Sequence, residues 1–382
     1  MRGIFSLPLR PVARERLRIL GVGPGRSINF LRWAWRLGER GHEVHVASTQ
    51  LSELPGELDG IHAHDAGSLG LATRLPVVRR HAIGPAVGRL ARSLEVDLVH
   101  GHYLLPFGWW AAQTGVHPLV MSPWGTDILI HARRPGRGNE RARAALAAAD
   151  FLVTNSLVNE QASAALGADP NRMRRIVWYA DVDRFAPGRA DPDLRRRLGW
   201  PEDAWVALSL RNSRPDMNLD VVVRAFVRAA REEPGARLVM AARPSLAGSE
   251  IERLVDVLGI GDRVHFASLG RDELPGLVAA CDALVTVTSS DSTPASLLEG
   301  MASGLPVVAA SAPSIDEWVG QDDGAEVVAP RDEEATAAAL LRLLRDPGLA
   351  ARYGERNERV ARERVPDPGQ ALEDLYRELL AA

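Results

Sequence analysis

Short apolar runs alternate with amphipathic and polar segments over most of the chain. In the first half, the apolar runs predict buried strands at residues 17–23, 44–47, 97–100 and 119–121. The amphipathic segments predict helices at residues 27–40 and 74–94, and a helix through Trp109 and Trp110. The stretch between the second strand and Ala66 is rich in turn residues. Strands that alternate with helices in this way indicate a parallel, doubly wound sheet.

A second alternating series follows the polar, turn-rich segment FAPGRADPD, which contains Pro187 and Gly188. Its predicted strands span residues 205–210, 237–241, 264–267, 283–288 and 307–310. Its predicted helices span residues 218–231 and 251–258, a segment between 267 and 283, and residues 294–303. We expect helices in the remainder, the last at 370–382. A chain of 382 residues is also too long for one core, so the sequence predicts two α/β domains, 1–186 and 187–366.

The most informative segment is SSDSTPASLLEGMASGLPVVAA, which begins at Ser289. Thr293 is a suitable N-cap and Pro294 suits the first helical position. Gly304 suits the left-handed residue after the helix, and Pro306 prevents the helix from continuing. The helix therefore begins at a polar loop, where backbone N–H groups without intrahelical partners attract phosphate.

Asp291 and Glu299 stand eight positions apart, one before this helix and one inside it. Carboxylates do not favour phosphate, but they accept hydrogen bonds from the hydroxyls of a sugar. The pair is therefore compatible with a ligand that carries both phosphate and sugar. The alternative is a capped surface helix with two ordinary acidic residues.

Composition limits the chemistry of the chain, which is 46% hydrophobic and 25% charged, as in globular proteins. The single cysteine, Cys281, cannot form an intrachain disulfide and lies in an apolar run, which suits a reducing cytosol. No apolar run is long enough to span a membrane. The basic N-terminal segment has Pro and Arg where a signal peptide needs an apolar core. We therefore expect a cytoplasmic protein.

The sequence contains 46 arginines and no lysine, which excludes a Walker-type lysine and a pyridoxal Schiff base. The turn GVGPGRS has Arg26 where a dinucleotide fingerprint needs glycine, which argues against a nicotinamide cofactor. The turn can still let its backbone approach a phosphate at Gly25. No D-x-D sequence lies near a predicted strand end of the first domain, so we expect no bound metal. We also expect that the protein uses its substrates without a cofactor.

Charge is unevenly distributed. Residues 1–184 contain 23 arginines and 16 acidic residues, whereas the remainder contains 23 arginines and 33 acidic residues. A solvated basic face is the simpler interpretation. A peripheral contact with the inner face of an anionic membrane, and with a lipid-linked acceptor, is the other. That hypothesis rests on Arg32, Arg36, Arg79, Arg80, Arg89 and Arg92.

Several strings resemble the retaining glycosyltransferases of family 4. LLEGMASGLPVVA is close to that family's usual LLEAMACGLPVVA, and Asp291 and Glu299 take the places of its E-x7-E pair. The strings RWAWRLGERGHEVHVAS, DLVHGHYLLPFGWWAA, PLVMSPWGTDIL and YADVDRF also resemble family segments. The resemblance implies the GT-B fold, in which two Rossmann-like domains face each other across a cleft. It also implies that a final helix, here 367–382, joins the first domain.

The resemblance assigns roles to individual residues. It implies a first, acceptor-binding domain and a second domain that binds a nucleotide-sugar. The implied catalytic residues are His102, Arg211 and Asp291. The implied donor-binding residues are Gly25, Arg211, Asn218, Asp291, Ser292, Thr293, Pro294, Ala295, Ser296, Leu297 and Glu299. The implied acceptor-side residues are Ser27, Trp124 and Asp127.

Three substitutions depart from the family pattern. Asp291 replaces a glutamate, Asp216 stands where the family has a lysine directed at the donor diphosphate, and Tyr179 replaces a glycine. Arg214 could compensate for the missing lysine, or it could be a solvated loop residue.

The predicted function is hexosyl transfer, with retention, from a nucleoside-diphosphate sugar to the hydroxyl of a sugar, a lipid-linked sugar or a small molecule. Two alternatives stay open: a nucleotide-sugar epimerase or hydrolase of the same fold, and a non-catalytic partner subunit. We expect no nucleic-acid partner.

Overall fold

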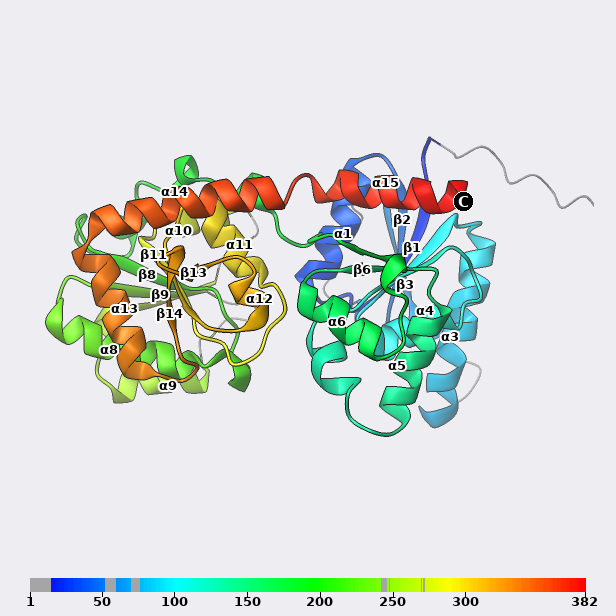
Figure 1. Cartoon of the computed structure of the whole chain (residues 1–382), viewed down its shortest axis with the longest axis horizontal. Coiled ribbons are helices and arrows are strands. Elements are labelled where there is room, and N and C mark those ends of the chain that lie inside the picture. Colours follow the sequence, from blue (N-terminus) through cyan, green and yellow to red (C-terminus); the bar gives the residue numbers. More distant parts are fainter. Residues whose placement is uncertain are drawn as a thin grey trace, which may run out of the picture. The chain divides into compact units, whose positions relative to one another are not determined.

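The computed structural model describes residues 15–51, 60–69, 76–241, 246, 248–268, 270 and 272–382, with the side chains of residue 69 and residues 76–81 left out. The chain forms two compact units (Figure 1). Unit 1 comprises Met1–Asn155, Asn159–Tyr179 and Asp367–Ala382, and unit 2 comprises Ser156–Val158 and Ala180–Pro366. We describe each unit by itself.

Unit 1 contains a parallel seven-stranded sheet with the order β3-β2-β1-β4-β5-β6-β7. The strands are β1 (Arg18–Val22), β2 (Glu43–Ser48), β3 (Ile61–Asp65), β4 (Leu98–His102), β5 (Leu119–Ser122), β6 (Phe151–Thr154) and β7 (Met173–Arg175). The α-helices are α1 (Ile28–Glu39), α2 (Ala66–Leu69), α3 (Pro76–Ser93), α4 (Trp109–Ala112), α5 (Arg137–Ala148), α6 (Leu157–Ala165) and α15 (Pro368–Ala381). Shorter helical turns span Leu104–Gly108, Asp127–His131 and Pro170–Arg172.

Unit 2 contains a second seven-stranded sheet with the order β10-β9-β8-β11-β12-β14-β13. The strands are β8 (Val206–Ser209), β9 (Arg237–Ala241), β10 (Val264–Ala267), β11 (Ala283–Thr286), β12 (Val307–Ala310), β13 (Gly320–Gln321) and β14 (Gly324–Val328). The α-helices are α7 (Leu194–Arg197), α8 (Leu219–Glu232), α9 (Glu250–Val257), α10 (Leu274–Ala279), α11 (Ala295–Ala302), α12 (Pro313–Asp316), α13 (Glu333–Arg345) and α14 (Pro347–Arg364). Shorter turns span Val182–Arg184, Pro187–Arg189, Pro215–Met217 and Gly261–Arg263.

Two Rossmann-like sheets confirm the predicted fold class. The central strands are buried on both faces, as in β4, β8 and β12. Apolar residues therefore make up all of β12 and most of β8, whereas β4 (LVHGH) also contains two buried histidines. The predicted strands at 237–241, 264–267 and 307–310 coincide with β9, β10 and β12.

Five strands were not predicted, namely β3, β6, β7, β13 and β14, and two of the expectations were wrong. The supposed turn region before Ala66 contains β3, whose sequence IHAHD places polar histidines on a partly exposed strand at the edge of the sheet. The remainder of unit 2 was expected to be all helical but contains β13 and β14. Strands β6 and β7 have four and three residues, too few to show a periodic pattern.

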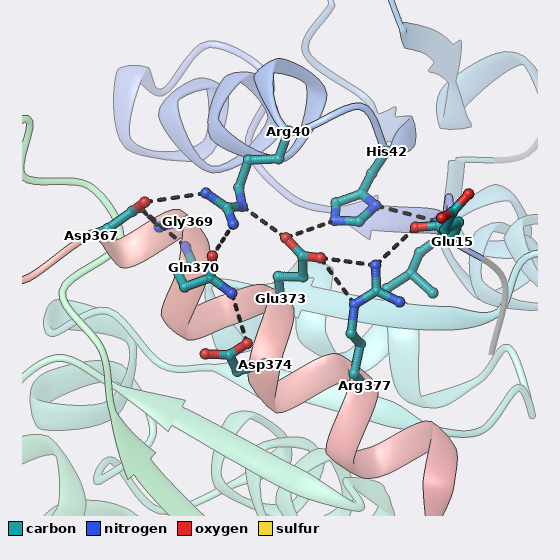
Figure 2. Close-up of polar contacts among 10 residues, drawn as sticks. Glu15, Arg40, His42, Asp367, Gly369, Gln370, Glu373, Asp374 and Arg377 are labelled. Carbon is teal, nitrogen blue, oxygen red and sulfur yellow. Dashed lines mark hydrogen bonds and ion pairs between the residues drawn. The ribbon is translucent and has the colours of Figure 1, made fainter.

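Helix α15 belongs to unit 1, although the chain reaches it only after completing unit 2. It begins at Pro368, two residues before the predicted start. Figure 2 shows its polar contacts with the rest of unit 1: Glu373 lies 2.8 Å from Arg40 Nε and 3.5 Å from His42 Nε2. Arg377 in turn pairs with Glu373 and donates to the carbonyl of Glu15. The helix is therefore held in unit 1 by a connected set of charges.

Candidate functional site

The strand order of unit 2 locates the point at which a ligand is expected. Strands β8 and β11 are neighbours, but the chain visits β9 and β10 on one side before it returns to β11. Open parallel sheets bind ligands beyond the carboxyl ends of their strands at such a reversal. Arg211 follows β8 and Asp291 follows β11, so the sheet order places the loops of both residues at this point.

Arg211 is buried, with 9% of its surface exposed, and its guanidinium contacts three side chains of unit 2. Nη1 donates to Ser296 Oγ at 3.1 Å. Nη2 forms an ion pair with Asp291 and lies 3.0 Å from Met217 Sδ. Because Ser296 belongs to the first turn of α11, these contacts place the positive charge beside the beginning of that helix.

Helix α11 begins one residue later than predicted. Pro294, with φ −74° and ψ 129°, is the N-cap, so the assignment of that role to Thr293 was wrong. Thr293 Oγ1 instead accepts a hydrogen bond from Trp318 Nε1 at 3.2 Å. Proline carries no side-chain acceptor, so the N-cap residue leaves the first N–H groups of α11 to other partners.

The end of α11 matches the prediction. Gly304 has φ +74°, and its N–H donates to the carbonyl of Met301 at 2.9 Å. The N–H of Leu305 donates to the carbonyl of Gly300 at 3.0 Å, which completes a Schellman motif.

The two acids of the predicted pair are placed differently. Glu299 lies within α11 with 4% of its surface exposed. Asp291 lies in the loop, where its Oδ1 accepts from the N–H of Ser292 at 2.8 Å and its carbonyl accepts from Ser314 Oγ at 2.8 Å. The loop is therefore fixed at Asp291 by both main-chain and side-chain contacts.

Asn218 organises the same edge of unit 2. It has φ +50°, and its Nδ2 donates to the carbonyl of Val287 at 2.8 Å and to Ser289 Oγ at 2.7 Å. Its Oδ1 accepts from Arg331 Nη1 at 3.0 Å. These contacts connect the start of α8 to the loop after β11.

Arg214 forms an ion pair with Asp216, the acid that stands where the family pattern has a lysine. Both side chains are partly exposed, and the two residues lie close together in the loop that follows β8. Arg211 is the arginine of this loop that contacts Ser296 of α11.

In unit 1 the corresponding reversal lies between β1 and β4, and β4 ends with His100 and His102. Trp33 Nε1 donates to the Tyr376 hydroxyl at 2.9 Å, so that hydroxyl can donate its own hydrogen to His100 Nδ1 at 2.5 Å. His100 Nε2 then donates to Ser122 Oγ at 2.7 Å. Burial lowers the pKa of His100 to about 3, so the ring is neutral. Tyr376 lies 276 positions away, and no local sequence signal marks this pairing.

His102 is fully buried among aromatic rings. Its ring centroid lies 4.0 Å from that of His100, 4.7 Å from Trp33 and 5.0 Å from Phe30. Burial holds its pKa well below the usual value for histidine. Neither ring nitrogen has a hydrogen-bond partner among the described residues. Its predicted catalytic role stays a prediction.

The other residues predicted in the first domain organise loops. Gly25 donates its N–H to Ser48 Oγ at 2.9 Å, and a Cβ atom there would lie 2.8 Å from the carbonyl oxygen of Gln50. Ser27 precedes α1 as its N-cap and accepts backbone bonds through its carbonyl. The turn therefore requires glycine at 25 for close packing of the backbone.

Asp127 is buried, and its carboxylate accepts from the N–H groups of Leu104 at 2.7 Å, Gly125 at 2.8 Å and Trp124 at 3.0 Å. Burial raises the pKa of Asp127, and the backbone donors oppose that shift. Asp127 thus joins the loops after β4 and β5, and Trp124 is fixed in this arrangement through its main chain.

Two arginines of the predicted membrane face point inward. Arg32 Nη1 donates to the carbonyl of Tyr179 at 2.7 Å, and Arg36 Nε donates to that of Trp178 at 3.0 Å. Arg89 and Arg92 are exposed. The side chains of Arg79 and Arg80 lie outside the described residues.

Within the part of the chain that the structure describes, no helix is long and apolar enough to cross a membrane. Nor does any group of three or more His, Cys, Asp or Glu side chains there have a metal-binding arrangement.

Two family models match the chain, one in each half. The model of glycosyl transferases group 1 matches residues 190–360, and the glycosyl transferase 4-like model matches residues 18–156.

Named relatives align over most of their length. A D-inositol 3-phosphate glycosyltransferase of Salinispora tropica is 30% identical, over 94% of this chain and 82% of the relative. An N-acetyl-alpha-D-glucosaminyl L-malate synthase of Bacillus anthracis is 27% identical, over 86% of both chains.

Solved structures share the architecture at low identity. A sucrose-phosphate synthase of Thermosynechococcus elongatus has a TM-score of 0.78 at 19% identity and covers 96% of this chain and 100% of its own. The Anabaena protein Alr3699/HepE, solved with UDP-glucose, has a TM-score of 0.76 at 19% identity. The match covers 95% of this chain and 100% of the Anabaena chain. At these identities the likeness supports the fold alone.

Proposed function

Because the chain belongs to family 4 of the GT-B glycosyltransferases and is a nucleotide-sugar-dependent transferase, we propose that unit 2 holds the donor and that the sugar is transferred with retention of its configuration. The observation that carries this proposal is the position of Arg211 at the beginning of α11, within reach of Ser296.

The diphosphate of the donor binds to Arg211 and to the first N–H groups of α11, at Ala295, Ser296 and Leu297. Helix N-termini and arginine forks are both suited to phosphate oxygens. In this type of transfer the sugar becomes oxocarbenium-like while the leaving diphosphate gains negative charge. A fixed cation beside a helix N-terminus stabilises that charge most strongly at the transition state.

Glu299 accepts hydrogen bonds from the ribose of the nucleotide. Its position inside α11, one turn after Ser296, supports this role, because both side chains then lie on one face of the helix. Asn218 and the residues from Asp291 to Pro294 shape the loops around the donor and hold them through the contacts described above.

The acceptor carries a hydroxyl and a negative charge. The two named relatives act, by their names, on inositol 3-phosphate and on malate, which are both anions with hydroxyl groups. The excess of arginine over acid in residues 1–184 supports an anionic acceptor for unit 1. The alternative proposal is a lipid-linked acceptor at a membrane. Among the described side chains, it is supported by the exposed Arg89 and Arg92.

A panel of UDP-, GDP- and ADP-sugars tests the function. Release of the nucleoside diphosphate should depend on an added acceptor, with inositol 3-phosphate and malate tried first, and the product should keep the anomeric configuration of the donor by NMR. Conversion of the donor without an acceptor would favour the epimerase or hydrolase. Donor binding without any turnover would favour the non-catalytic subunit. A ligand at a hundred times its Kd stabilises the protein by about 2.7 kcal/mol, so a thermal-shift screen identifies the nucleotide first.

A further inference from the structure

Asp291 and Arg211 face each other across the two loops at the reversal of the unit 2 sheet, and their side chains form an ion pair. We propose that Asp291 is a positioning residue that acts through Arg211: its carboxylate orients the guanidinium and offsets part of its charge, and so sets the affinity for the donor diphosphate. This inference rests on the proposed function, in which Arg211 binds that diphosphate.

The pair is well shielded from water. The Arg211 side chain is 10% exposed and that of Asp291 is 23% exposed. Salt and water screen such a pair less than an exposed one, so each charge influences the other strongly. The carboxylate of Asp291 therefore changes the electrostatic potential that a phosphate meets at Arg211.

The acid is the fixed member of the pair. Its Oδ1 accepts from the N–H of Ser292, and its carbonyl accepts from Ser314 Oγ. The guanidinium is then confined between Asp291 on one side and Ser296 and Met217 on the others. Such confinement reduces the number of orientations that the arginine fork can adopt.

The length of the side chain is consistent with this role. An aspartate reaches one methylene less far than the glutamate of the family pattern. Here Oδ1 and Oδ2 of Asp291 each accept a hydrogen bond from the protein itself. The carboxylate is therefore directed at the phosphate-binding arginine.

The substitution Asp291→Asn separates this role from a sugar contact, because a free nucleoside diphosphate contains no transferred sugar. Asparagine keeps the shape and removes the negative charge that offsets part of the charge of the Arg211 guanidinium. Calorimetry with UDP, GDP and ADP should show about three- to tenfold tighter binding of the nucleotide that the protein accepts, which corresponds to roughly 0.7–1.4 kcal/mol. The kcat for transfer should fall on the order of ten- to a hundredfold, because the guanidinium is less well oriented.

Asp282→Asn is the matched control. Asp282 also pairs with an arginine, Arg195, with 23% of the Arg195 side chain and 35% of the Asp282 side chain exposed, but it precedes β11 and so lies at the amino ends of the strands, away from Asp291. Its removal should change the nucleotide affinity less than about twofold. Thermal unfolding and circular dichroism establish that both variants are folded.

A double-mutant cycle with Arg211→Ala completes the test. The tighter binding caused by Asp291→Asn should vanish when Arg211 is absent, since the acid acts through the arginine. Equal tightening with and without Arg211, or no tightening when Arg211 is present, overturns the inference. If Arg211→Ala alone leaves the nucleotide affinity unchanged, the proposed donor site itself is wrong. The two failures are therefore distinguishable.

Discussion

Arginine provides every permanent positive charge on the side chains of this protein, because the sequence has 46 arginines and no lysine. Individual arginines serve different purposes. Arg32 and Arg36 hold backbone carbonyls inside unit 1, whereas Arg211 lies at the beginning of α11 with an acid beside it. A planar fork with several donors suits both tasks.

Replacing Arg211 should affect catalysis more than ground-state binding. The leaving diphosphate carries its largest charge at the transition state, so Arg211→Ala should lower kcat on the order of 10²–10³. Arg211→Lys keeps the charge but loses the fork, so its kcat should lie between that of the unmodified protein and that of Arg211→Ala. Steady-state kinetics on folded variants, with donor affinity measured separately, provide the check. A kcat within about threefold of the unmodified protein would instead assign the diphosphate to another cation, Arg214 first.

Replacing Glu299 should weaken the nucleotide itself. A hydrogen bond to a charged group is worth roughly 1.5–3 kcal/mol, so Glu299→Ala should reduce the calorimetric affinity for the free nucleoside diphosphate about ten- to a hundredfold. Glu299→Gln is the control, because it keeps the size and an acceptor oxygen and should lose less. Unchanged affinity in the alanine variant would remove Glu299 from the ribose site.

At the scale of elements, α11 depends on how it ends. Gly304 closes the helix with φ +74°, and a Cβ atom there would lie 3.0 Å from Pro187 Cγ. Both features belong to unit 2. The position of Glu299 and Ser296 therefore depends on a glycine that lies beyond the end of the helix.

Gly304→Ala should destabilise unit 2 for two reasons. The left-handed backbone costs a non-glycine residue about 1–2 kcal/mol, and the contact with Pro187 adds to that. Gly259→Ala isolates the first cost, because Gly259 follows α9 with φ +65° and has no atom within 4 Å of the added Cβ. Urea unfolding should show a larger loss for Gly304→Ala than for Gly259→Ala. Equal losses would contradict the crowding argument.

At the scale of the whole molecule, the two units differ in how they bury histidine. The pKa values of five histidines in unit 1 are lowered, with burial as the largest cause: His42, His45, His64, His100 and His102. Among the described residues of unit 2, only His265 behaves in this way. Unit 1 therefore contains most of the neutral, buried imidazoles.

Unit 1 should lose stability first on mild acidification. A histidine whose folded pKa is lowered binds more protons when unfolded, so its contribution is complete above pH 6.5 and is lost as the pH falls below that value. For His100, whose folded pKa is about 3, the loss is about 1.4 kcal/mol per pH unit over most of that window. Hydrogen exchange at pH 7.5 and 5.5, corrected for intrinsic rates, should show lost protection in unit 1. Peptides of unit 2 are the internal control, and an equal or greater loss there would refute the prediction.

The sequence by itself determined the class of the fold and the shape of α11 at its end. Buried parallel strands are continuous apolar runs, and Gly304 is a local signal, so both could be recognised without knowledge of distant residues. The resemblance supplied the candidate residues around α11. The edge strand β3 could not be recognised, because its partly exposed histidines interrupt the apolar pattern.

Only the tertiary structure decided which polar groups meet. The order of the strands brings Arg211 to Asp291, 80 positions away, and Tyr376 to His100, 276 positions away. Trp318 donates to Thr293, 25 positions away, and Pro294 is the N-cap of α11. A local pattern records burial and backbone preference, whereas the partner of a polar side chain depends on which loops the sheet makes neighbours.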